Sequence, residues 1–173
     1  MKRLHDCQWF ALVVKPRHEK VVDSALRTKG IESFLPLYSE RRRWKDRYTD
    51  VILPLFPGYV FSRFEARSRS FILGTPGVFD IVRCGKEPAA IPDEEIAALQ
   101  IAVSSGRAAE PWPHLVPGEL VQLDAGPLAG LVGKVLKLKS SMKLVLSVGL
   151  LNRSIVVEIE REWVRPLVSR KAS

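Results

Sequence analysis

A proline-rich segment near the middle of the chain limits how the chain can fold. The segment is SSGRAAEPWPHLVPG, at residues 104–118, and its prolines are Pro111, Pro113 and Pro117. Proline lacks the backbone N–H and clashes with the preceding helical turn, so no helix can continue through these positions. The small residues before them favour a flexible connection. We therefore expect one folded unit over residues 7–105, a linker over 106–116 and a second unit over 117–168.

Composition and charge narrow the class of protein. Of 173 residues, 46% are hydrophobic and 27% are charged, which is typical of a folded globular protein and excludes disordered or collagen-like architectures. Lys and Arg exceed Asp and Glu by 27 to 19, a formal charge of +8. Residues 1–110 contain 18 basic and 14 acidic residues and residues 111–173 contain 9 and 5, so each part carries +4. This excess favours a polyanionic partner, for which DNA, RNA and a membrane surface remain open.

The sequence lacks the patterns of catalytic, metal and targeting sites. Cys7 and Cys84 are far apart and have no CxxC spacing, so we expect neither a disulfide framework nor a metal site, and a reducing compartment. There is no signal-peptide pattern and no apolar run long enough to cross a membrane. The histidines are scattered, and no serine elbow or P-loop is present. These features predict a cytoplasmic binding protein that contacts no membrane, is not an enzyme and uses no cofactor.

Alternating apolar runs and helical periods predict an α+β first unit. We expect strands at QWFALVV and GVFDIVRC, an extended segment at IESFLPL, and a third strand that starts near Gly58 because Pro54 and Pro57 precede it. Helices are expected at residues 16–29, 66–74 and 93–103. The polar segment RRRWKDRYTD is expected to be a basic loop or hairpin tip. Strands interleaved with helices predict a sandwich around one antiparallel or mixed sheet.

Short, closely spaced strands predict a β-barrel in the second unit. The five segments are ELVQLD, VGKVLKL, KLVLSV, SIVVEIE and EWVRPL. Gly126, Gly130 and Gly133 lie in and after a tight loop, where positive φ or close backbone approach favours glycine. Five strands of this length are enough for a small barrel.

Two motifs resemble the NusG family of transcription factors. FPGYVF at residues 56–61, preceded by WFALVV and followed by TPGV, is similar to the N-terminal (NGN) domain of that family, and PGELVQLDAGPLAGLVGKV at 117–135 is similar to its KOW motif. The resemblance implies an NGN α/β sandwich with a mainly antiparallel sheet, followed by an SH3-like five-stranded KOW barrel. It also implies a bacterial transcription elongation or antitermination factor. WKDRYTDVILPLFPGYVF, IPDEEIAAL and LLNRSIVVEI are closest to the specialised UpxY- and RfaH-like paralogues, which accompany RNA polymerase through long operons.

The resemblance implies a polymerase-binding surface on the NGN domain. In the family, aromatic residues around FPGYVF dock on the clamp helices of the largest polymerase subunit. The matching residues here are Trp9, Phe56, Pro57, Tyr59 and Phe61. Strand alternation places Tyr59 and Phe61 on one face. The alternative is that these rings belong to the core, which we expect for at least one of them. Ser68, Arg69 and Ser70 occupy the place of a Thr-rich element that contacts the gate loop of the second-largest subunit.

Two basic clusters are candidates for binding nucleic acid. Lys15, Arg17 and His18 precede the first helix, where free backbone N–H groups also attract anions. In antiterminator relatives this end of the domain faces the displaced non-template DNA strand. The second cluster contains Arg41, Arg42, Arg43, Trp44, Lys45 and Arg47, with Tyr48 beside it. Interleaved rings can stack on unpaired bases. A merely solvated hairpin tip explains this cluster equally well.

The KOW domain is implied to recruit a second partner. In the family this partner is a small-subunit ribosomal protein or the termination factor Rho, and the matching residues are Leu150, Leu151 and Arg153. RfaH-like relatives can hold this domain as a helical hairpin, but β-branched residues and three glycines disfavour helix here, so we predict a barrel that does not switch. We also expect the protein to be a monomer. The alternatives to a polymerase-binding factor are an RNA-binding or ribosome-associated KOW protein and an enzyme with an unrecognised site.

Overall fold

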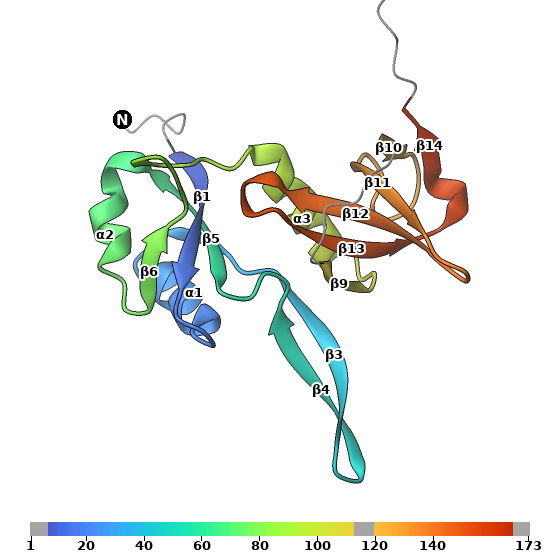
Figure 1. Ribbon diagram of the computed structural model, residues 1–173, viewed down its shortest axis with the longest axis horizontal. Helices are drawn as coiled ribbons and strands as arrows, with labels where there is room; N and C mark the ends of the chain where they lie inside the picture. Colours follow the sequence, from blue (N-terminus) through green and yellow to red (C-terminus); the bar gives the residue numbers. More distant parts are fainter. Residues whose placement is uncertain (1–6, 113–119, 168–173) are drawn as a thin grey trace, which may run out of the picture. The chain divides into compact units, whose positions relative to one another are not determined.

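The computed structural model describes residues 7–112 and 120–167 (Figure 1). The chain divides into two compact units between Ile96 and Ala97, and each is described by itself. Within the described residues, no helix is long and apolar enough to cross a membrane. The predicted boundaries at residues 105 and 117 stay predictions.

An antiparallel sheet of four strands forms the centre of the first unit. Its order is β2 (Glu32–Phe34), β5 (Tyr59–Glu65), β1 (Cys7–Val14) and β6 (Val78–Ile81). β1 and β5 pair along their whole length, from Cys7 opposite Glu65 to Val13 opposite Tyr59. The apolar run QWFALVV forms β1, as predicted, and β5 begins at Tyr59, one residue after the predicted start. The predicted mixed α/β unit with an antiparallel sheet is therefore confirmed.

One face of this sheet packs against helices. α1 (Glu19–Thr28) and α2 (Arg69–Leu73), which follows the short 3-10 helix η2 (Ala66–Ser68), contribute to this core. The core residues are Phe10, Leu12, Val14, Val22, Leu26, Val60, Phe64, Ile72 and Ile81. The rings of Phe10 and Phe64 lie 4.7 Å apart. Burying each large apolar side chain stabilises the fold by about 1.5–3 kcal/mol, so this face fixes the position of β1 and β5.

The remaining elements of this part of the chain are two hairpins and a helix. β3 (Leu37–Trp44) and β4 (Arg47–Pro54) form a long hairpin, and β7 (Arg83–Cys84) and β8 (Glu87–Pro88) form a short one. The β3–β4 hairpin is a separate two-stranded sheet that extends away from the body of the first unit (Figure 1). α3 (Asp93–Ser104) begins with three acidic residues, which the positive end of the helix dipole stabilises.

The second unit contains an antiparallel sheet of six strands. Its order is β14 (Val164–Pro166), β10 (Leu120–Leu123), β11 (Val132–Lys137), β12 (Met142–Val148), β13 (Arg153–Ile159) and β9 (Ala109–Trp112). The short 3-10 helices η3 (Gly149–Leu151) and η4 (Arg161–Trp163) connect strands at its ends. β10 to β14 are the five predicted strands. The expectation of five is corrected, because β9 adds a sixth.

β9 lies in the predicted linker and contains a proline. Its Pro111 is opposite Ile155 of β13, and β9 is the last strand in the sheet. Proline cannot donate a ladder hydrogen bond, but an edge strand has one side on which no donor is needed. Pro111 therefore ends helical structure, as expected, without preventing a strand. Pro113 and Pro117 lie outside the described residues.

Alternation gives the second sheet an inner face. Leu123, Leu144 and Ile155 on this face are each 0% exposed. A Cβ at Gly133 would lie 2.6 Å from the carbonyl oxygen of Val145, so the close packing of β11 and β12 requires glycine there. Gly126 has φ +77, and a Cβ there would lie 2.5 Å from the Trp163 ring. The predicted structural role of these glycines is confirmed.

Candidate functional site

The face of the first sheet that does not carry the helical core is aromatic. Trp9 of β1 and Phe61 of β5 share it, since they alternate with the core residues of the same strands. The Phe61 ring lies 5.4 Å from Phe56 in an edge contact and 6.2 Å from the stacked ring of Phe34. Trp9 is 4% exposed, Phe56 is 1% exposed and Phe61 is fully buried. The predicted alternation of β5 is confirmed.

The FPGY turn between β4 and β5 is held by a buried carboxylate. Gly58 has φ +86, a conformation that strongly favours glycine. Its backbone N–H donates to Oε1 of Glu19 at 3.0 Å, and its carbonyl accepts from the N–H of Val14 at 2.9 Å. Glu19 is only 6% exposed. The first residue of α1 therefore positions this turn, together with β1.

Of the five predicted polymerase-binding residues, Pro57 and Tyr59 are the ones that reach the surface. Pro57 is exposed and Tyr59 is half-buried, while the other three members are buried. Phe56 and Phe61 form an aromatic layer next to the turn, which Glu19 fixes. Contact of a partner with Trp9, Phe56 or Phe61 stays a prediction, and it requires those rings to become accessible.

The predicted gate-loop residues lie at the other end of β5. Ser68 ends η2, and Arg69 and Ser70 begin α2. Arg69 is exposed and forms an ion pair with Glu87 at 3.0 Å. Because the FPGY turn precedes β5 and these residues follow it, the length of the strand, about 20 Å, separates the two groups. The structure does not bring them together as one patch.

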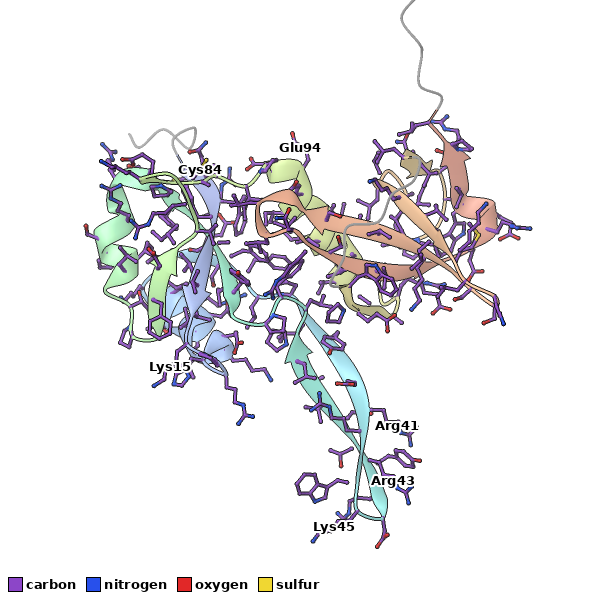
Figure 2. The ribbon with its side chains drawn as sticks, in the orientation of Figure 1. Lys15, Arg41, Arg43, Lys45, Cys84 and Glu94 are labelled. Atoms are coloured by element: carbon purple, nitrogen blue, oxygen red, sulfur yellow. The ribbon has the colours of Figure 1, made fainter. Side chains whose placement is uncertain are left out.

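The β3–β4 hairpin brings the second basic cluster together. Its register runs from Leu37 opposite Pro54 to Trp44 opposite Arg47, with Lys45 and Asp46 in the turn. Every residue from 41 to 50 is exposed, and Trp44 and Tyr48 are 70% and 61% exposed. Figure 2 shows Arg41, Arg43 and Lys45 spaced along the hairpin to its tip. All six predicted residues of this cluster therefore lie on one projecting element.

The two sides of the hairpin differ in what their arginines contact. Arg41 lies on one side with its guanidinium 5.0 Å from the centre of the Tyr48 ring, a cation–π contact. On the other side, Arg42 forms an ion pair with Glu40 at 2.8 Å. Opposite pairs in the register share a side, so Trp44 lies with Arg42 and Arg47. Each side combines cations with a ring, which is the combination that single-stranded nucleic acid binds.

The other basic cluster lies in the turn between β1 and α1. Lys15 and Arg17 are exposed, and Arg17 has φ +65. The Nδ1 of His18 lies 3.0 Å from the carbonyl oxygen of Pro16. Lys20, the second residue of α1, donates from Nζ to the carbonyl of Ile52 in β4 at 2.9 Å. This bond attaches the start of α1 to the base of the β3–β4 hairpin, which carries the cluster around Arg41.

Asp80 on β6 is an ion-paired carboxylate whose pKa is shifted. The Arg83 guanidinium donates to both its carboxylate oxygens, at 2.6 and 2.8 Å, and the Ile81 N–H donates at 2.8 Å. These bonds, that from Arg83 first, lower the pKa of Asp80 below its ordinary value. Asp80 is therefore a structural carboxylate that stays ionised.

The predicted partner-binding residues of the second unit lie around one tight turn. Leu150 and Leu151 are in η3, and Arg153 begins β13 opposite Val148. All three are half-buried. Asn152 between them has φ +50, which Asn tolerates better than most residues. The structure brings these residues together where β12 ends and β13 begins.

Two residues of the candidate site were not predicted from the sequence. Glu19 holds the FPGY turn, and Phe34 stacks on Phe61. Glu19 has a weak signal in the sequence, as an acidic residue in an otherwise basic helix start, KPRHEK. Phe34 is in a short apolar segment whose partner strand could not be identified without the fold.

Comparison with known proteins gives a family match and a fold match. Residues 7–100 match the model of the NusG family, described as transcription termination factor nusG. Among solved structures, the chain is similar to Thermotoga maritima NusG, in a structure that describes domain interaction in that protein. The two are 17% identical over 95% of this chain and 99% of that one, with a TM-score of 0.58. A structure of the MjSpt4:Spt5 complex in conformation B matches at 21% identity over 95% and 99%, with a TM-score of 0.32.

Proposed function

Since this chain belongs to the NusG family, we propose that it is a transcription elongation factor whose first unit binds RNA polymerase and suppresses pausing or termination. The proposed mechanism bridges the polymerase clamp and the opposite side of the cleft, which keeps the enzyme closed on nucleic acid. Such a factor must bind the closed state more tightly than the paused one. A difference of about 1.4 kcal/mol shifts that equilibrium tenfold.

The FPGY turn is the proposed contact with the clamp helices of the largest subunit. The observation that supports it is an exposed Pro57 beside a half-buried Tyr59, on a turn that Glu19 and Val14 fix through two backbone hydrogen bonds. A fixed turn loses little conformational entropy on binding. Phe56 and Phe61 shape it from beneath. Ser68, Arg69 and Ser70 remain the proposed contact with the gate loop of the second-largest subunit, as a separate patch.

The β3–β4 hairpin is the proposed contact with DNA, and the non-template strand is its proposed target. Exposed arginines would attract the phosphates, and Trp44 and Tyr48 would stack on unpaired bases. Lys15, Arg17 and His18 would add cations near the base of the hairpin, to which Lys20 connects α1. If the hairpin is instead only a solvated tip, the chain should not bind single-stranded DNA through it.

The second unit is proposed to be a KOW barrel that recruits a small-subunit ribosomal protein or Rho through Leu150, Leu151 and Arg153. Their grouping on η3 and the first residue of β13 supports one compact contact surface. The specialised UpxY- or RfaH-like role stays a prediction. A gene position at the head of a polysaccharide cluster would support it, and an isolated housekeeping position would contradict it. A bacterial, cytoplasmic monomer is part of the same proposal.

Polymerase pull-down with the full chain tests this function. We expect the unaltered chain to recover RNA polymerase, and Tyr59→Ala to reduce recovery about tenfold or more, which is typical of a central aromatic contact. Phe79→Ala is the matched control, since Phe79 is a 67% exposed aromatic of the same unit that the proposal does not use. Recovery of ribosomes without polymerase would instead favour an RNA-binding or ribosome-associated KOW protein.

A further inference from the structure

The inner face of the second sheet opens into a groove at one end. A depression of about 410 Å³ is lined there by residues of four strands and η4. The apolar lining residues are Val121, Val135, Met142, Val164 and Pro166. The register places all five on the inner face, together with the buried Leu123 and Leu144. The groove is therefore a part of the apolar interior that the described chain leaves uncovered.

Two cations lie at the rim of this groove. Lys137 is the last residue of β11, opposite Met142, and Arg161 begins η4. Both side chains are exposed, and within the described residues neither has an ion-pair or hydrogen-bond partner. The nearby acid Glu160 is engaged with Arg107 at 3.0 Å. No acidic residue is among the described residues that line the groove; Glu158 and Glu160 line the adjoining depression, which shares Lys137, Met142 and Arg161 with it.

We propose that this groove binds a short acidic segment of another protein, with an aliphatic side chain inserted between Val121 and Met142 and carboxylates near Lys137 and Arg161. Apolar side chains with an unbranched methionine adapt to an inserted aliphatic group. Exposed cations without an ion-pair partner among the described residues attract carboxylates. None of the described lining residues has an aromatic ring on which a base could stack, so RNA is disfavoured. A second copy is disfavoured because each chain carries a net charge of +8.

The groove is distinct from the proposed partner surface at Leu150 and Leu151. It lies where β12 begins, at Met142, whereas η3 follows the other end of that strand, at Val148. The length of β12 separates the two by about 20 Å. The second unit can therefore hold two protein partners at once.

Titration of the isotope-labelled full chain with a capped peptide tests the proposal. The probe has two central leucines flanked by aspartates and glutamates. We expect saturable amide shifts at Val121, Val135 and Met142. A peptide with asparagine and glutamine in place of the acids, and one with serine in place of the leucines, should each bind about tenfold more weakly.

Charge reversal supplies the matched control. K137E/R161E should weaken binding of the acidic peptide about tenfold or more, whereas K45E/R47E makes the same change in net charge on the hairpin and should leave it unchanged. Well-dispersed amide spectra of both variants check that the fold is intact. The proposal is overturned if no saturable shifts occur, if they centre on Leu150 and Leu151, if both variants weaken binding equally, or if a single-stranded RNA oligonucleotide binds the groove more tightly than the peptide.

Discussion

The two aromatic groups of the first unit have opposite environments. Phe56 and Phe61 are buried beside the FPGY turn, whereas Trp44 and Tyr48 are among the most exposed large side chains of the hairpin. Phe61, Trp44 and Tyr48 are all rings on antiparallel strands, so residue type and secondary structure do not distinguish the buried ring from the exposed ones. Their neighbours do. Phe61 lies in the four-stranded sheet, and its neighbour Val60 packs in the core on the other face of that sheet. Trp44 lies among arginines on a two-stranded ribbon that is a separate sheet. An isolated hairpin cannot bury both its sides.

The comparison is tested most strongly by removing one ring from each group. Phe61→Ala should lower the free energy of unfolding by about 3–5 kcal/mol, because it leaves a cavity beside Phe34 and Phe56. Trp44→Ala should lower it by less than about 0.5 kcal/mol, because the ring is exposed. Urea unfolding followed by tryptophan fluorescence or circular dichroism measures both. Equal losses would show that the hairpin ring also stabilises the fold.

Removing the hairpin arginines should affect binding and not folding. Replacing Arg41, Arg42 and Arg43 by alanine should weaken single-stranded DNA binding about hundredfold at about 0.1 M salt and reduce the slope of log K against log salt by about 2, if each arginine contacts one phosphate. Fluorescence anisotropy over a salt series measures this. The control replaces Lys137, Lys139 and Arg161, with the same loss of charge. An equal effect of both triple variants would indicate attraction by net charge alone.

Stacking by the hairpin ring can be separated from charge. Trp44→Ala should weaken binding of single-stranded DNA by about 1–3 kcal/mol, and Trp44→Phe should restore much of it because the ring returns. Binding of duplex DNA, in which the bases are not available for stacking, should change little. If both substitutions weaken both ligands alike, the tryptophan does not stack on bases.

The smallest expected effect concerns the ionised Asp80. Its native pKa lies below its ordinary value, so the carboxylate contributes stability that is complete above the ordinary pKa of 3.8 and is lost as the pH falls through the lower native pKa. Asp80→Asn should remove this contribution, so that its unfolding free energy differs from that of the unaltered chain near neutral pH and converges with it in acid. Urea unfolding at several pH values measures the difference. A gap that widens in acid would contradict the assignment.

Local patterns predicted most elements of the fold. The run QWFALVV, the helix between Pro16 and Gly30 and the five C-terminal strands all appear close to where their periodicity placed them. The local pattern does not predict β9, because Pro111 is typical of a linker. Whether proline interrupts a strand depends on whether that strand is at an edge, and the position in the sheet is not visible in a local pattern.

The candidate site was only partly predictable, because its geometry depends on non-local contacts. Alternation correctly placed Tyr59 and Phe61 on one face of β5, but it does not say which residues that face buries. The Glu19 carboxylate and the Gly58 N–H are on elements that meet only after folding. The hairpin cluster was easier, since its residues are contiguous and a two-stranded ribbon exposes them on either side.

The register of the β3–β4 hairpin also limits how its sequence can vary in length. Tyr48 lies opposite Arg43, and Arg41 is two residues from Arg43 on the same strand, so Arg41 and Tyr48 lie on the same side of the hairpin. The Arg41 guanidinium can therefore contact the Tyr48 ring. Inserting one residue between Tyr48 and Asp50 would transfer the tyrosine to the reverse side, beside Trp44, and would leave Arg41 without its ring. Functional variants of this ribbon should therefore gain or lose residues within a strand in even numbers.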